Sequence, residues 1–310
     1  MATGPSRPLT VDGAAIAEAA GGGPGPTFAP GRRLELPRRG TTFVREMAGP
    51  EGAPTLLLLH GWCATGGLNW FQTFETLGER YRVIAPDLRG HGQGVRSRRV
   101  FRLADCADDC AATLVELGTG PVIAVGYSMG GPIAQLLWRR HRDLVSGLVF
   151  CATTSGFFPN RRERLSYQSA MLTGVAAARA ATFTRAVPAL PGLGMRPSRL
   201  PTWAADEARR HDWRSIVEAG HSIGTYHATR WIDQVDVPTS IVCTTKDRGV
   251  RPELQLALAE SIPGATIHRI DEGHLACAMT DFGRVVREAC DDVANRIERS
   301  DSTERAAAAD

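Results

Sequence analysis

A serine stands between glycines where a short apolar run gives way to a helix-like pattern. Residues 121–125 are apolar, the stretch Gly126-Tyr127-Ser128-Met129-Gly130 follows, and residues 132–138 have the spacing of a helix. A hydroxyl at such a junction costs stability unless it is hydrogen-bonded or used. Glycines two positions away on either side make room for a sharp strand-to-helix turn that presents the serine oxygen. We therefore predict that Ser128 is a nucleophile.

A base and an orienting acid follow later in the chain. Asp247 comes just after the apolar run 239–245, and His274 comes just after the run 265–271. A serine hydroxyl becomes a good nucleophile only when such a base takes its proton. We predict a Ser128-His274-Asp247 triad, in the chain order Ser, Asp, His. Asp271 is the competing acid, but it lies only three residues before His274, which makes the far ring nitrogen difficult to reach.

Two backbone N–H groups are candidates for binding the oxyanion that acyl transfer produces. Met129 supplies one at the start of the predicted helix, where the helix dipole favours negative charge. Trp62 supplies the other from the loop after residues 55–59, and Gly61 lets that backbone come close. We predict that these two groups form an oxyanion hole.

The remaining conspicuous polar residues have simpler interpretations. His60 precedes a glycine at a predicted strand end, where a histidine is expected to brace the loop by hydrogen bonds. The stretch 87–94 is similar, and we expect Asp87, Arg89 and His91 to stabilise it. The other histidines lack a comparable setting, and most are expected on the surface or in an inserted segment: His141, His211, His221, His227 and His268.

Large apolar side chains near these segments suggest a pocket for an apolar acyl or alcohol group. The predicted pocket residues are Trp62, Tyr127, Phe157, Phe158, Met171, Trp203 and Trp231. Ordinary packing in the core of the lid is the alternative for five of them: Phe157, Phe158, Met171, Trp203 and Trp231.

Apolar runs alternate with helical patterns along most of the chain. The runs lie at 55–61, 81–87, 121–128, 147–154, 239–245 and 265–271, with helical stretches such as 103–117 and 252–261 between them. Continuous apolar runs are typical of buried parallel strands, and the alternation indicates an α/β sheet with helices on both faces. Residues 158–229 interrupt this rhythm without a clear strand. We expect them to form an inserted helical lid.

Composition limits the class of protein further. The 310 residues are 43% hydrophobic, their net charge is only +3, and no long basic block suggests nucleic-acid binding. No membrane span, signal peptide or metal-ligand spacing is evident. Seven cysteines, an odd number, suggest free thiols and a reducing, cytoplasmic location. Residues 1–33 are expected to be a flexible leader, 34–157 and 230–298 the two parts of the core, and 299–310 a tail.

Taken together, these motifs resemble the α/β-hydrolase superfamily, in its lid-bearing branch of serine esterases, C–C hydrolases and haloperoxidase-like enzymes. The resemblance rests on His60-Gly61-Trp62, residues 87–92 (DLRGHG), residues 126–131 (GYSMGG), Asp247 and Gly273-His274. It implies an eight-stranded, mostly parallel sheet that begins with an antiparallel hairpin over residues 34–47. It also implies that neither a metal nor an organic cofactor is needed.

These observations predict a serine hydrolase that cleaves a carboxylic ester of a small to medium apolar substrate through an acyl-enzyme. An acyltransferase or thioesterase would use the same acyl-enzyme, and a C–C bond hydrolase the same triad. A small-molecule receptor on a hydrolase fold is the alternative from another class, although a receptor has no need of an aligned triad. The sequence leaves the acyl chain, the alcohol and the oligomeric state open.

Overall fold

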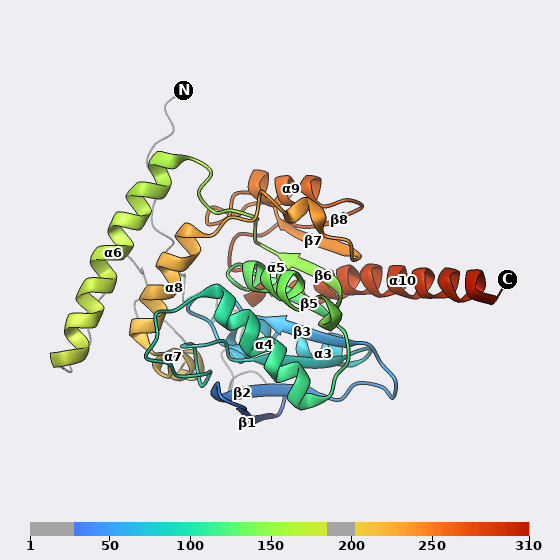
Figure 1. The fold of residues 1–310 in the computed structure, drawn as a ribbon, viewed down its shortest axis with the longest axis horizontal. Coiled ribbons are helices and arrows are strands. Elements are labelled where there is room, and N and C mark those ends of the chain that lie inside the picture. The colour runs from blue at the N-terminus through green and yellow to red at the C-terminus, as the bar shows by residue number, and fades with distance from the viewer. Residues whose placement is uncertain (1–27, 185–201, 310) are drawn as a thin grey trace.

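An eight-stranded sheet forms the centre of the described part of the chain (Figure 1). The computed structural model describes residues 28–184 and 202–309. The strands are β1 (Gly31–Leu36), β2 (Gly40–Met47), β3 (Thr55–Leu59), β4 (Arg82–Pro86), β5 (Val122–Tyr127), β6 (Val145–Cys151), β7 (Thr239–Thr244) and β8 (Thr266–Ile270). Their order is β1-β2-β4-β3-β5-β6-β7-β8. Only the β1–β2 and β2–β4 pairs are antiparallel, so the predicted, mostly parallel sheet is confirmed.

Each of the six apolar runs coincides with one strand of the sheet, although β6 begins at Val145, two residues before its run, and the predicted hairpin is β1–β2. The hairpin begins at Gly31, three residues before the expected boundary at 34, because Gly31 pairs with Arg45 of β2. The last three residues of the expected leader therefore belong to the sheet. Residues 1–27 of that leader lie outside the described residues.

Alternate leucines of β3 show how the sheet is covered on both faces. Leu57 and Leu59 pack in one core cluster, whereas Leu56 and Leu58 pack in the other. The first cluster includes side chains of α4 (Leu103–Leu117), α5 (Gly130–Arg140) and α9 (Pro252–Ser261). The second includes side chains of α2 (Gly66–Trp70), α3 (Phe74–Gly78) and α10 (Phe282–Ala309). The continuous apolar runs are thus explained by burial on both sides of the sheet.

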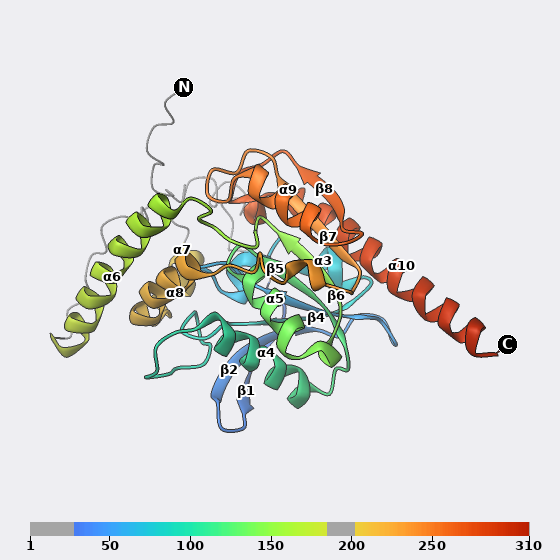
Figure 2. The same cartoon turned by 45° about the horizontal axis from the view of Figure 1, so that its top comes forward.

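The segment expected to be a lid is helical where it is described. It contains α6 (Arg161–Thr184), α7 (Thr202–Arg209) and α8 (Trp213–Thr225), and residues 185–201 lie outside the described part. α6 and α8 pack against each other along one side of the molecule (Figure 2). No strand is found in residues 158–184 or 202–229.

The carboxyl-terminal helix is longer than the sequence pattern suggests. α10 runs to Ala309, so the expected tail is largely helical and extends away from the sheet (Figure 1). In the portion of the chain that the structure describes, no helix combines the length and the apolar character needed to cross a membrane.

Candidate active site

Ser128 occupies a strained turn between β5 and α5. Its φ is 50°, in the left-handed region that few non-glycine residues adopt. The Ser128 N–H donates to the Cys151 carbonyl at 2.9 Å, and the Ser128 carbonyl accepts from the Thr153 hydroxyl at 2.7 Å and the Gly131 N–H at 3.0 Å. These hydrogen bonds hold the turn on both sides and compensate for its strain.

The glycines around Ser128 are required by close backbone contacts. A Cβ at Gly126 would lie 2.5 Å from the Gly130 carbonyl oxygen, and one at Gly130 would lie 2.1 Å from the Leu59 carbonyl oxygen. Neither backbone has room for a side chain. The G-x-S-x-G spacing therefore reflects how closely α5 approaches β3 and β5 at this turn.

Ser128, His274 and Asp247 lie in one hydrogen-bonded chain. The Ser128 Oγ and the His274 Nε2 are 2.9 Å apart, and the His274 Nδ1 is 2.8 Å from the Asp247 Oδ2. The Asp247 side chain is fully buried, whereas the imidazole is 18% exposed. The structure thus brings together the three residues singled out in the sequence, and it leaves part of the imidazole exposed.

Asp247 is fixed by more than its contact with His274. Its Oδ1 accepts from the N–H groups of Gly249 and Val250 at 2.7 and 2.9 Å. Its Oδ2 also accepts from the Thr244 hydroxyl at 2.9 Å. Four donors therefore set the orientation of this carboxylate.

Asp271, the competing acid, points elsewhere. Its carboxylate accepts from the Thr245 hydroxyl and the Lys246 ammonium, both at 2.8 Å. The Lys246 hydrogen bond lowers the pKa of Asp271, and the side chain is 76% exposed. It is a surface ion pair and not a partner of the imidazole.

The loop that carries Trp62 lies beside the turn that carries Ser128 and Met129. A Cβ built on Gly61 would lie 3.5 Å from the Ser128 Cβ, so the loop carrying Trp62 passes directly beside the serine. The Gly61 N–H donates to the Asn69 Oδ1 at 2.9 Å, which fixes this loop. Within the described part of the chain, neither the Trp62 nor the Met129 backbone N–H has a hydrogen-bond acceptor.

His60 and the stretch 87–94 stabilise loops, as predicted. The His60 Nε2 accepts from the Leu88 N–H at 2.9 Å, and its Nδ1 donates to the Gly61 carbonyl at 2.8 Å. Arg89 forms two hydrogen bonds with the Asp109 carboxylate at 2.7 and 2.8 Å. Asp87 and His91 form hydrogen bonds with the backbone. The Asp87 carboxylate accepts from the N–H groups of Gly66 and Gln93, and the His91 ring donates to the Arg89 carbonyl.

His211 does not lie on the surface. It lies in the inserted segment between α7 and α8, but it is buried, and its Nδ1 accepts from the Gly92 N–H at 2.8 Å. Its Nε2 lies 3.2 Å from the Cys63 carbonyl oxygen. Its ring is 5.6 Å from that of His91, which in turn is 5.2 Å from that of His60. The contacts of His211 itself span more than a hundred residues of sequence, so no local pattern reveals them.

Burial keeps this histidine cluster neutral. It lowers the pKa of His211 to about 4 and that of His60 to about 3, and it holds the pKa of His91 well below its ordinary value. An unfolded chain binds these protons near pH 6.5, so between about pH 4 and 6.5 the unfolded state holds more protons than the folded state. The free energy of unfolding therefore falls as the pH drops through this range. Asp87 has the opposite effect on the free energy of unfolding. Burial raises its pKa to about 6, so the folded state binds this proton more readily than the unfolded state does.

We expect acidification to destabilise the wild-type protein more than the variant His211→Gln. Glutamine does not titrate, so the variant lacks the contribution of this histidine, on the order of 1–2 kcal/mol between pH 7 and pH 5. Urea unfolding of both proteins at the two pH values, followed by circular dichroism, measures the difference. Equal losses in the two proteins would show that His211 is protonated in the folded state at pH 5.

Three of the predicted pocket residues contact helices of the insert. A Cβ at Gly220 of α8 would lie 2.7 Å from the Trp62 indole and 2.9 Å from the Met171 Sδ, so these two side chains meet over α8. Phe158 stacks on Tyr167 with ring centroids 4.4 Å apart. Tyr167 was not singled out in the sequence, although it lies one helical turn before Met171 and therefore on the same face of α6.

The other four predicted pocket residues have structural contacts instead. Tyr127 is buried and donates from its hydroxyl to the His274 carbonyl at 2.7 Å. Phe157 packs against the first core cluster, and the Trp203 ring packs edge-on against Phe71. Trp231 stacks on Trp138, near the end of α5 opposite to Ser128. Trp231 is partly buried against the first core cluster, and its assignment to the pocket stays a prediction.

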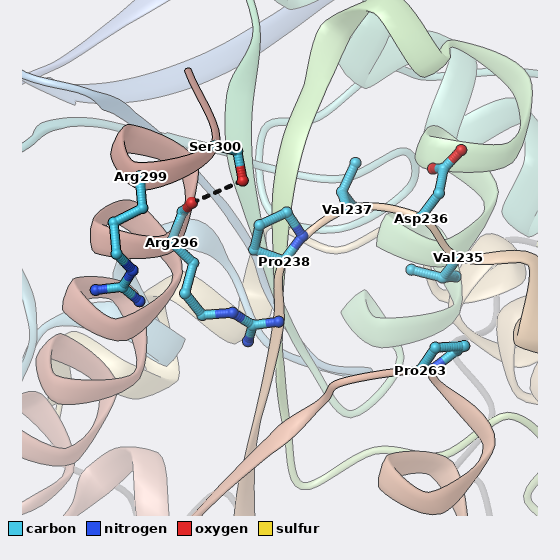
Figure 3. A pocket seen from close by; sticks show the side chains of 8 residues that line it. All are labelled: Val235, Asp236, Val237, Pro238, Pro263, Arg296, Arg299 and Ser300. Carbon is cyan, nitrogen blue, oxygen red and sulfur yellow. Dashed lines mark hydrogen bonds between the residues drawn. The ribbon is translucent and has the colours of Figure 1, made fainter. Parts of the chain in front are cut away.

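A surface hollow of about 420 Å³ lies near the amino ends of β7 and β8 (Figure 3). Its lining residues are Val235, Asp236, Val237, Pro238, Pro263, Arg296, Arg299 and Ser300. They precede β7 and β8 or lie on α10, whereas Ser128, Asp247 and His274 follow the carboxyl ends of their strands. Open parallel sheets bind ligands at the carboxyl ends, so we separate this hollow from the candidate active site. No group of three potential metal-ligating side chains is found within the described ranges.

The comparisons with known proteins agree with this architecture. Residues 54–278 match the family described as alpha/beta hydrolase fold. A thermophilic esterase from Thermogutta terrifontis superposes with a TM-score of 0.64 at 22% identity, over 86% of this chain and 99% of that one. The chain therefore belongs to the α/β-hydrolase family, and this membership supports hydrolase activity.

Two curated relatives show how far the sequence similarity extends. The 30 kDa magnesium-chelatase subunit of Rhodobacter capsulatus is 28% identical over 73% of this chain and 82% of its own length. A pimeloyl-[acyl-carrier protein] methyl ester esterase of Vibrio vulnificus is 34% identical over 36% of this chain. That second match spans only 41% of the esterase.

Proposed function

We propose that this hydrolase cleaves a carboxylic ester of a small to medium apolar substrate, with Ser128 as its nucleophile. The observation that carries the proposal is the continuous chain from the Ser128 Oγ through His274 to the Asp247 carboxylate, with contacts of 2.9 and 2.8 Å. A serine bonded to an imidazole, which a buried carboxylate orients in turn, is the arrangement that activates a hydroxyl for attack on a carbonyl.

The proposed reaction has two halves. The Ser128 Oγ attacks the ester carbonyl carbon while its proton moves to the His274 Nε2, and the N–H groups of Trp62 and Met129 stabilise the oxyanion. The imidazolium then protonates the leaving alcohol, and the acyl group remains on Ser128. Water gives a proton to the same nitrogen and attacks the acyl carbon. The bond between the acyl carbon and the Ser128 Oγ then breaks, the imidazolium returns the proton to the Oγ, and the acid leaves.

The inserted segment 158–229, with its described helices α6, α7 and α8, is proposed to act as the lid that shapes the substrate site. Trp62 and Met171 meet over Gly220, and Phe158 stacks on Tyr167 of the same helix as Met171. These side chains offer an apolar surface on the insert. We propose that it receives the acyl or alcohol part of the substrate.

A substrate screen tests the proposed function. p-Nitrophenyl esters of rising chain length are compared with lactones and acyl-CoA thioesters, and each rate is also measured with Ser128→Ala. Hydrolysis of esters that depends on Ser128 supports the proposal. Preference for the thioesters, or product formation only with an added alcohol or amine, would identify a thioesterase or an acyltransferase instead. The absence of Ser128-dependent turnover on every acyl substrate would refute it.

A further inference from the structure

We propose that the α7–α8 part of the insert positions the Trp62 backbone N–H for oxyanion binding, with the Trp62 indole and His211 as its two points of attachment. The inference rests on the proposed function. It makes His211 a positioning residue, because its contact with the reacting atoms is indirect and passes through the loop that carries Trp62.

The first attachment is the Trp62 indole. Its Nε1 donates to the Ile216 carbonyl of α8 at 2.8 Å, and Ile216 is fully buried. The indole also lies against Gly220, one turn further along the same helix, where a Cβ would lie 2.7 Å from the ring. The side chain and the backbone of Trp62 are covalently joined, so a ring fixed on α8 limits the movement of the adjacent N–H.

The second attachment is His211, which holds the residue after Trp62. The Gly92 N–H donates to the His211 Nδ1, so this nitrogen carries no proton and the Nε2 is the donor to the Cys63 carbonyl. Cys63 has φ 60°, a conformation that costs a non-glycine residue on the order of 1–3 kcal/mol. A strained loop relaxes unless its surroundings hold it, and the His211 hydrogen bond holds it directly beside Trp62.

The insert is itself fastened to the core around His211. Glu207 of α7 is buried, accepts from the Thr65 hydroxyl at 2.8 Å and lies 3.7 Å from the Arg45 guanidinium. On the other side of His211, the Asp212 N–H donates to the Gly90 carbonyl at 2.8 Å. The segment that carries His211 is therefore held to the core on both sides, and a residue that positions another must itself be held in place.

Three variants test the inference. Trp62→Phe removes the indole N–H and keeps an aromatic ring and the backbone N–H. His211→Asn keeps an amide near the Nδ1 position, beside Gly92, but does not reach Cys63. His211→Gln is the matched control, because its amide reaches the Nε2 position and donates to Cys63.

We expect Trp62→Phe and His211→Asn to lower kcat for a p-nitrophenyl ester about tenfold with KM within about twofold, because a misplaced oxyanion donor weakens only the transition state. Their affinity for an alkyl boronic acid, which forms a tetrahedral adduct with the serine, should fall by a similar factor. His211→Gln should stay within about threefold of wild type in both measurements. All assays are made below the onset of thermal unfolding, as followed by circular dichroism.

Two results would overturn the inference. In one, folded Trp62→Phe and His211→Asn keep wild-type kcat and boronate affinity. In the other, His211→Gln and His211→Asn lose activity equally, which would point to general packing at this position. If the wild-type protein itself shows no Ser128-dependent turnover, the proposed function fails first, and the role given to Trp62 fails with it.

Discussion

Replacement of Ser128 by alanine is expected to lower kcat for ester hydrolysis by about 10³-fold or more while leaving the protein folded. The substitution removes one oxygen atom and with it the whole covalent route. The contacts that hold the turn come from the Ser128 backbone, through Cys151, Gly131 and Thr153, and alanine retains them. The fold should therefore tolerate the change even though the chemistry does not.

Steady-state kinetics with the best p-nitrophenyl ester measures this loss, and thermal unfolding checks the fold. A fluorophosphonate probe adds an independent readout, because it labels an activated serine and should label only the wild-type protein. A folded Ser128→Ala protein that turns over the ester at a near-normal rate would exclude a serine nucleophile at this position.

Asp247→Asn should cost about 10²- to 10⁴-fold in kcat. The N–H groups of Gly249 and Val250 both point at the Oδ1 of Asp247, so an asparagine keeps its oxygen there and turns its NH₂ group toward His274. The imidazole must then accept at Nδ1 and carry its proton on Nε2. In that tautomer the nitrogen facing Ser128 no longer takes the hydroxyl proton.

Asp271→Asn is the matched control, with a loss of about tenfold at most. Its carboxylate contacts only Thr245 and Lys246 among the described hydrogen bonds and ion pairs, and it is largely exposed. Kinetics of the two purified variants, each checked by circular dichroism, decides between the acids. Greater damage from Asp271→Asn than from Asp247→Asn would mean that the acid is misassigned, although Ser128 and His274 could keep their roles.

Much of the fold was predictable because the signals are local. Burial on both faces makes a strand such as β3 continuously apolar, and such runs identified the strands of the parallel part of the sheet. The candidate triad was also visible, because each member directly follows a different strand and the carboxyl ends of parallel strands meet at one edge of a sheet. The glycines around Ser128 predicted a turn for a related reason, since a tight turn restricts which residues can stand next to it in the chain.

What the sequence by itself determined is therefore the class of the fold, the strands and the three residues whose order and setting predict a serine hydrolase. The sequence favoured Asp247 over Asp271, but only the tertiary structure places a carboxylate oxygen of Asp247 2.8 Å from the His274 Nδ1. Only the tertiary structure also decided that Trp231 packs on the far end of α5 and that His211 is a buried link to the loop beside Trp62. The physical reason is that strand and turn signals arise between residues close in the chain. Contacts such as those of His211 with Cys63 and Gly92 join segments more than a hundred residues apart, and only the packing of the insert on the core specifies them.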